Sequence, residues 1–363
     1  MGGTSQIGAR AFDTVQGMMG ERLAYLDALR GMALVLMVVN HTARYWIGPE
    51  IGWTRYHLIY VTTSVAGPIF LFLVGFVLPL SFDTAKRPGL KYARRALGMV
   101  TAGYVLNVLV FSQDSWMAGN VLHTIGLAIL FATPLLRVMH RPEVRLAIVV
   151  LAVVLYATFN RWFAPLTGWV ERHPKLAEVW FYDFPLWPWM SLVLLGLVLG
   201  WGARAHTGER ERARYFAVLA VAGAACLAVA VAWEAWTPGR PPLGFTRDYV
   251  LNHHWIPSGA TAAGILGVIF VCQAIIYYLM TVRGHRLRPL VIAGQSAFLL
   301  YFLHHFIVVS LVQRALGIRM HSWWVYWLAT AVLMAALIAL AAGWLTIKRG
   351  RRPASAVDVA AAA

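Results

Sequence analysis

An apolar segment near the start of the chain carries four ionisable side chains, Asp27, Arg30, His41 and Arg44. At about 100° per residue, Arg30 and His41 differ by roughly 20° around a helix, and the other two fall within about 60° of Arg30. Ionisable groups are costly in a membrane-spanning helix, so they usually have a partner or a function. The shared face therefore predicts a polar stripe that points into a helix bundle and not at lipid.

Histidine is the side chain in this stripe best suited to proton transfer near neutral pH. His41 lies roughly 20 Å from the cytoplasmic end of its predicted helix, at 1.5 Å per residue. Other predicted helices place His304 and His305 at a similar depth and His123 near the outer end of its helix. All of these groups fall in the outer half of the membrane, so they form one polar site if the helices meet. The candidates for binding substrate there are Arg44, Asn40, His123, Tyr301, His304 and His305. The alternative is structural: each histidine is a hydrogen-bonded core group, and Arg30 only pairs with Asp27.

The composition indicates which elements must position these groups. The chain has 363 residues, of which 60% are hydrophobic and 13% charged, whereas soluble domains carry about twice that charged fraction. Uncharged runs long enough to span a bilayer predict an all-α integral membrane protein, a single bundle of about ten helices. The predicted spans are 28–47, 60–82, 94–113, 119–138, 144–162, 186–203, 214–236, 258–281, 289–313 and 322–346.

The basic residues predict the orientation of this bundle. They concentrate in the loops that are cytoplasmic if both termini are cytoplasmic, so the net charge of +16 reflects topology and not nucleic-acid binding. We expect a cytoplasmic segment 1–21, a transmembrane domain 22–347 and a basic, Ala-rich cytoplasmic tail 348–363. Cys226 and Cys272 lie in apolar runs, and no disulfide or metal-ligand spacing is visible.

Several further features have two interpretations. The basic group Lys86, Arg87, Lys91, Arg94 and Arg95 could hold phosphates or only set topology and contact lipid headgroups. Gly67, Pro68 and Gly75 indicate either close helix packing or a break beside a cavity. The aromatic connections 163–185 and 237–257 are an interfacial belt or a substrate-facing rim. Weaker candidates are Arg55 and His57, just before the second predicted helix, and Asn252, His253 and His254.

Arg30, ten intervening residues and His41 together resemble the Arg-x10-His signature of the acyltransferase-3 family. The stretches 22–31, 36–42 and 67–75 resemble bacterial proteins of the related heparan-alpha-glucosaminide N-acetyltransferase family, and 122–126 and 300–304 also look similar. The resemblance implies a membrane acyltransferase of ten or eleven helices. Such proteins move an acyl group, usually acetyl, from cytoplasmic acyl-CoA to a sugar hydroxyl or amine, often on the far side of the membrane. His41 matches the catalytic histidine and Arg30 the motif arginine.

The chain departs from this pattern at one place. Eukaryotic members tend to have Asn at the position of His41 and a catalytic histidine further on, for which His57 is the nearest equivalent here. His41 and His57 are therefore both candidates for the catalytic histidine.

We expect acyl-CoA to place its phosphates near Lys91, Arg94 and Arg95. His41 then acts as general base or carries the acyl group. Arg30 orients the donor or stabilises developing negative charge, and Asp27 holds Arg30. The predicted partners are acyl-CoA, a sugar, glycan or glycolipid acceptor and membrane lipids, with no metal and no nucleic acid. The predicted location is the cytoplasmic (inner) membrane, crossed several times. The alternatives are a lipid or glycan exporter without chemistry and a haem- or quinone-binding membrane protein.

Overall fold

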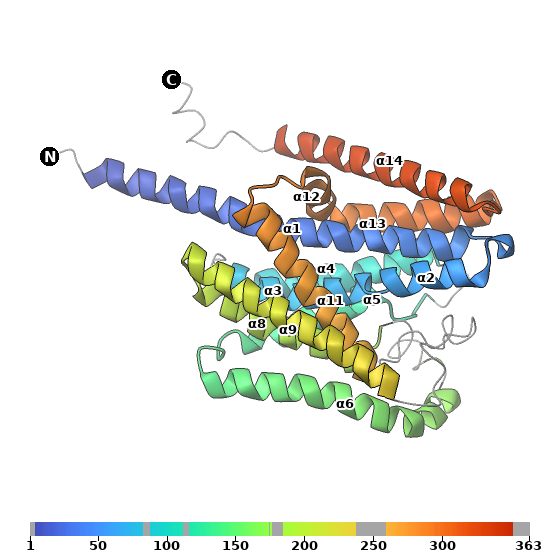
Figure 1. Ribbon diagram of the computed structural model, residues 1–363, viewed down its shortest axis with the longest axis horizontal. Helices are drawn as coiled ribbons and strands as arrows, with labels where there is room; N and C mark the ends of the chain where they lie inside the picture. The colour runs from blue at the N-terminus through green and yellow to red at the C-terminus, as the bar shows by residue number, and fades with distance from the viewer. Residues whose placement is uncertain are drawn as a thin grey trace. The chain divides into compact units, whose positions relative to one another are not determined.

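The computed structural model describes residues 4–82, 88–111, 116–173, 175, 184–236 and 259–350. Side chains are described for these residues except 4–23, 159–171, 234 and 349–350. The described part is all-helical without a strand, and its isolated bridge joins Ile47 to Met320. The chain forms two compact units, Met1–Ile51 with Gly284–Ala363 and Gly52–Arg283, whose helices are labelled in Figure 1.

The first unit combines helices from the N-terminal and C-terminal parts of the chain. Its helices are α1 (Thr4–Trp46), η1 (Pro49–Ile51), α12 (Arg288–Gln295), α13 (Ala297–His305), the π-helix η3 (Phe306–Ala315) and α14 (Trp323–Gly350). Glycines allow the backbones of α1 and α12 to touch. A Cβ atom on Gly31 would lie 1.9 Å from the Leu290 carbonyl oxygen, and one on Gly294 would lie 1.7 Å from that of Asp27.

The prediction of one continuous helix over 289–313 was wrong. The chain turns at Ser296, where φ is −107° and ψ is 14°, and Figure 1 shows α12 turned steeply away from α13. The backbone remains hydrogen-bonded through the turn, because Ser296 N–H donates to Ile292 and its carbonyl accepts from Leu300. Hydropathy could not reveal the turn, since apolar residues continue on both sides of it.

The C-terminal end of α1 is fixed by hydrogen bonds to the last third of the chain. The backbone N–H of Gly48 donates to Met320 at 2.9 Å, and the indole of Trp46 donates to the Val308 carbonyl at 3.1 Å. The Tyr326 hydroxyl lies 3.4 Å from that of Thr42 and donates to the Val39 carbonyl at 3.2 Å. These bonds hold the segment of α1 that carries His41 against η3 and α14.

The second unit consists of paired helices. Its elements are α2 (Trp53–Thr63), α3 (Ala66–Ser81), α4 (Pro88–Leu109), α5 (Val121–Leu135), α6 (Pro142–Arg172), α8 (Leu186–Ala205), α9 (Glu209–Trp236), α11 (Gly259–Tyr277) and the π-helix η2 (Tyr278–Val282). The pairs are α3 with α8, α4 with α5, and α9 with α11. A Cβ atom on Gly75 would lie 1.9 Å from the Val193 carbonyl oxygen, which confirms the close-packing interpretation of this glycine.

Two predicted helix starts were also wrong. The second helical segment begins at Trp53 and not at 60, so Arg55 and His57 lie on α2 and do not precede it. The first helix extends back to Thr4, well before the predicted span 28–47. Hydropathy locates the apolar part of a helix, whereas backbone hydrogen bonding continues into polar residues on either side.

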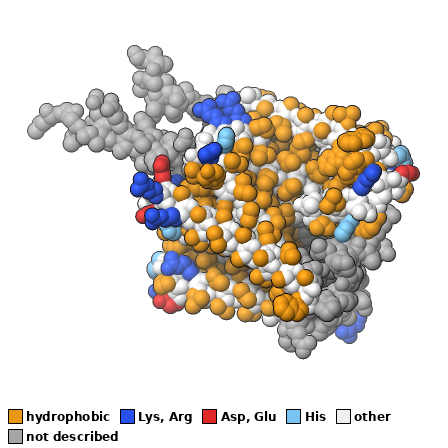
Figure 2. Space-filling model, in the orientation of Figure 1, with side chains coloured by type: hydrophobic (Ala, Val, Ile, Leu, Met, Phe, Trp, Pro, Cys, Tyr) orange, Lys and Arg blue, Asp and Glu red, His pale blue; other side chains and the backbone are white. Residues whose placement is uncertain are grey.

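Six helical segments of the described residues are long and apolar enough to cross a membrane. They are Trp53–Ser81, Leu186–Ala205, Glu209–Trp233, Gly259–Val282, Ala297–Ala315 and Trp323–Lys348. Large apolar side chains such as Val221 and Trp324 are exposed on these helices, and apolar side chains cover much of the face in Figure 2. The protein is therefore a multi-pass membrane protein. The other predicted spans coincide with α1, α4, α5 and α6, so ten crossings and cytoplasmic termini remain predictions.

Candidate functional site

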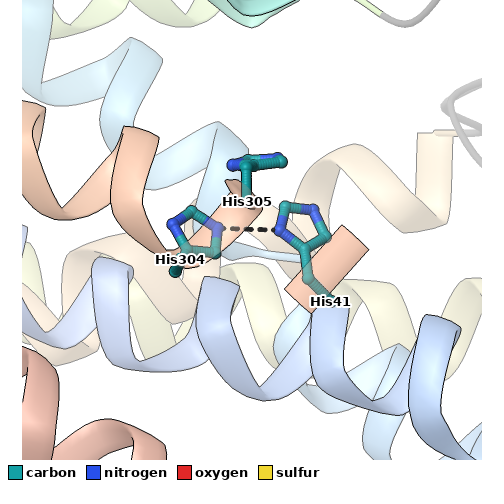
Figure 3. Close-up of side chains that lie close together, drawn as sticks. All are labelled: His41, His304 and His305. Carbon is teal, nitrogen blue, oxygen red and sulfur yellow. Dashed lines mark hydrogen bonds between the residues drawn. The ribbon is translucent and has the colours of Figure 1, made fainter. Parts of the chain in front are cut away.

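Three histidines from opposite ends of the chain meet in the first unit, and we call them the histidine cluster: His41, His304 and His305. His41 Nδ1 and His304 Nε2 lie 3.0 Å apart, and the two rings are parallel to within 2° (Figure 3). The ring centroid of His305 lies 4.4 Å from that of His41 and 4.1 Å from that of His304. The structure thus brings together three of the predicted site residues.

Helix α13 fixes the protonation pattern of this cluster. His304 and His305 occupy its last turn, and their Nδ1 atoms each lie 2.9 Å from a backbone carbonyl, of Leu300 and Tyr301 respectively. A carbonyl can only accept, so in the neutral ring Nδ1 carries the proton and Nε2 the lone pair. His304 Nε2 must then accept the proton of His41 Nδ1. The lone pair of His41 is consequently on Nε2.

The three histidines of the cluster differ in their exposure to solvent. His304 is 0% exposed and His305 4% exposed, whereas His41 is half-buried. Tyr301 is also buried, with its ring centroid 4.7 Å from that of His305. Asn40 is half-buried, and Arg44 is exposed with its guanidinium over the Tyr45 ring.

Asp27 and Arg30 form a separate feature on the same helix. Arg30 Nη1 donates to Asp27 Oδ1 at 2.7 Å, and Gln295 of α12 also hydrogen-bonds the carboxylate. Ten residues of continuous helix lie between Arg30 and His41, and the eleven steps from one to the other span about 16 Å along the axis. The expected pairing of Asp27 with Arg30 is confirmed. The structure does not bring Arg30 into the histidine cluster, because a shared helix face does not imply a shared depth.

His123 lies in the second unit and has a different environment. It is the N3 residue of α5, where its Nδ1 accepts from the backbone N–H of Asn120 at 3.1 Å in a capping box. Asn120 in turn donates to the Asn107 side chain at 2.8 Å and to the Gly103 carbonyl at 3.1 Å. The proton of the neutral His123 ring is therefore on Nε2, for which the described residues offer no hydrogen-bond partner. This geometry favours the structural interpretation of His123.

The remaining candidates also belong to the second unit or lie outside the described residues. His57 stacks on Trp53, with ring centroids 5.7 Å apart. Lys91, Arg94 and Arg95 are exposed near the start of α4. Candidates outside the described residues are Lys86, Arg87, Asn252, His253 and His254.

Sequence reasoning missed the groups that orient the histidines. The Leu300 and Tyr301 carbonyls leave no sequence signal, because any residue supplies a carbonyl. Asn120 could have been found, since Asn three residues before a polar side chain at the start of an apolar run is typical of a helix N-terminus.

Comparison with known proteins adds one finding. A family model described as heparan-alpha-glucosaminide N-acetyltransferase, catalytic, matches residues 22–234. No curated protein matches the chain. The matched segment contains most of α1, with His41, and also His57 and His123. It ends before α13, so His304 and His305 lie outside it.

Proposed function

Because the chain belongs to the heparan-alpha-glucosaminide N-acetyltransferase family, we propose that it transfers an acetyl group from acetyl-CoA to a sugar or glycan. The acceptor atom is an amine nitrogen or a hydroxyl oxygen of that sugar or glycan. This family consists of membrane acetyltransferases, and the apolar helices of the chain agree with a membrane location. The acyl-CoA donor, the acceptor and transfer across the membrane are the parts that we propose.

The observation that carries the proposal is the hydrogen-bonded chain from His41 through His304 to the Leu300 carbonyl. His304 Nδ1–H donates to that carbonyl at 2.9 Å, and His41 Nδ1–H donates to His304 Nε2 at 3.0 Å. A general base needs an accessible lone pair on a ring that is held in one tautomer. His304, as the positioning residue, holds the lone pair of His41 on Nε2, and His41 is half-buried whereas His304 and His305 are buried.

In the proposed reaction, His41 Nε2 takes the proton of the acceptor hydroxyl or amine. The acceptor atom attacks the thioester carbonyl, a C–O or C–N bond forms, and the C–S bond breaks. The leaving CoA thiolate then takes the proton from His41. The same lone pair also suits a relay in which His41 Nε2 itself carries the acyl group briefly.

Other predicted residues have supporting roles in this proposal. The exposed Lys91, Arg94 and Arg95 hold the phosphates of CoA, because Lys and Arg side chains bind phosphate by charge-assisted hydrogen bonds. Arg30, held by Asp27, orients the donor at a level about 16 Å along α1 from His41. Arg44, Asn40 and Tyr301 remain candidates for binding the acceptor.

Purified full-length protein in lipid nanodiscs, supplied with radiolabelled acetyl-CoA and an amino sugar, tests this function. We expect label on the sugar with the wild type and none with His41→Ala. Label on the protein without an acceptor, absent from His41→Ala, would identify the relay. Full transfer by His41→Ala together with none by His57→Ala would move the catalytic role to His57.

The two alternative functions give different results in the same preparation. A Soret band would indicate haem, yet two histidines on opposite faces of a haem iron need nitrogens roughly 4 Å apart. The nitrogens of His41 and His304 lie 3.0 Å apart, which does not match the spacing of two ligands on opposite faces of a haem. Binding of a glycolipid without any turnover of acetyl-CoA would favour an exporter.

A further inference from the structure

The histidine cluster has the donor set of a transition-metal site. His41, His304 and His305 each offer one ring nitrogen, and the three nitrogens lie within 4.8 Å of one another. Imidazole nitrogen is a preferred ligand of zinc, copper, nickel and iron, and three protein ligands with one open position are typical of zinc centres. The sequence shows no metal-ligand spacing because 263 residues separate His41 from His304.

The rings on α13 are already oriented as metal ligands are. A histidine that binds metal through one nitrogen usually donates its other N–H to a backbone carbonyl or a carboxylate, which fixes the ring and its tautomer. His304 and His305 both donate from Nδ1 to carbonyls, at 2.9 Å each. Their Nε2 atoms therefore carry the lone pairs.

The spacing agrees with tetrahedral coordination after a small adjustment. Zinc–nitrogen bonds of about 2.0–2.1 Å at tetrahedral angles place ligand nitrogens about 3.3 Å apart. The nitrogens of His41 and His304 lie 3.0 Å apart, and all three ligand nitrogens lie within 4.8 Å of one another. Rotation of the His41 and His305 rings by roughly 1 Å at the nitrogens closes this difference. The burial of His304 and His305 shields two of the three ligands from water.

We propose that His41, His304 and His305 bind one divalent transition-metal ion, with Zn²⁺ as the first candidate. The metal needs the lone pair of His41 on Nδ1, whereas the general-base form of His41 carries a proton there and its lone pair on Nε2. Metal binding therefore requires the other tautomer and removes the base. The site is an inhibitory one, and this consequence, unlike the binding itself, rests on the proposed acyl transfer.

Binding is tested without any activity assay. The purified full-length protein, treated with chelator and dialysed, is titrated with Co²⁺, whose visible absorption reports tetrahedral coordination, and with Zn²⁺ in competition. We expect one ion per chain, and at least about tenfold weaker binding by His304→Ala and by His305→Ala. Thermal unfolding of each variant without metal shows whether it is folded, and His305→Gln serves as a second variant if His305→Ala is not.

A matched control is available in the same chain. His140 also has Nδ1 near a backbone carbonyl, that of Arg137 at 3.2 Å, but it is exposed and outside the cluster. His140→Ala should bind Co²⁺ as the wild type does. If the wild type binds Co²⁺ no more tightly than the double variant His304→Ala/His305→Ala does, the proposed metal site is refuted.

The inhibitory effect is tested by measuring acyl transfer with and without Zn²⁺. We expect zinc to lower the wild-type rate over the concentration range in which it displaces Co²⁺, and chelator to restore it. His305→Ala, compared with its own zinc-free rate, should need at least about tenfold more zinc. Zinc binding without loss of rate would overturn the inhibitory role. Metal binding by a protein that transfers no acetyl group would refute the proposed function and leave the metal site supported.

Discussion

The histidine cluster and the His123 region both bury imidazole among helices, but their ring nitrogens have different partners. In the cluster, His304 donates to a carbonyl and accepts from His41, so the lone pair of His41 is on the nitrogen outside this chain of hydrogen bonds. At the start of α5, His123 uses its Nδ1 lone pair to cap a helix. The two regions teach that burial and depth do not identify a catalytic histidine. The direction of each ring nitrogen's hydrogen bond shows which nitrogen keeps a lone pair, and on this basis His41 and not His123 is the proposed general base.

The largest contrast should come from removing each histidine in turn. His41→Ala is expected to lower the rate of acyl transfer by about 10²–10⁴-fold, the usual contribution of a general base. His123→Ala should cost a smaller factor in rate and lower thermal stability by about 1 kcal/mol, because it removes half of a capping box. Radiolabel transfer and thermal unfolding of both purified variants check this. A larger loss of rate in His123→Ala would reverse the comparison.

Replacing His304 tests whether its hydrogen bond to His41 sets the tautomer of His41. His304→Ala should lower kcat by about 10–100-fold and leave KM for the acceptor little changed, because a positioning residue does not touch the substrate. His304→Gln should recover part of the loss, since its amide oxygen can accept from His41 Nδ1–H. Steady-state kinetics of the two variants provide the measurement. Equal activity of Ala and Gln at this position would argue against the tautomer role.

Two glycines on α4 test how tightly His123 is packed. A Cβ atom on Gly103 would lie 2.6 Å from Cε1 of His123, whereas one on Gly98 has nothing within 4 Å. Gly103→Ala should therefore destabilise the protein by about 1–3 kcal/mol through overpacking. Gly98→Ala should be neutral or slightly stabilising, because alanine favours helix. Thermal unfolding of the two variants in the same detergent compares them, and equal stabilities would mean that His123 moves aside freely.

Glu50 and His321 form an exposed pair, unlike the buried histidines of the cluster and of the His123 region, so we expect the smallest effect here. His321 Nδ1 donates to Glu50 Oε2 at 2.7 Å, and this hydrogen bond lowers the pKa of Glu50 below its usual range. A lowered carboxyl pKa adds stability above the unfolded-state pKa, and this stability is lost as pH falls through the folded-state pKa. Glu50→Gln should thus lower the melting temperature slightly near pH 6, and this difference should shrink as the pH is lowered through the range in which Glu50 becomes protonated. A difference that grows on acidification would contradict the sign.

Much of the molecule could be predicted from sequence because the signals are local. Apolar runs indicated where helices lie, although hydropathy missed the turn at Ser296 and the start of α2 at Trp53. The polar face of α1 identified His41, and three-residue spacing identified the pair of Asp27 with Arg30. Both inferences need only the helical repeat, which is the same in every protein.

Tertiary structure alone decided which of these groups act together. Only packing brought His304 and His305 to His41, because the contact joins residues 263 apart and depends on the turn at Ser296 and on η3. Contacts with α4 likewise placed His123 in a helix cap, whereas the separation of about 16 Å between Arg30 and His41 follows from the rise of α1 alone. The sequence alone determined the residue types and the helix faces, whereas the direction of each hydrogen bond followed from contacts between distant segments.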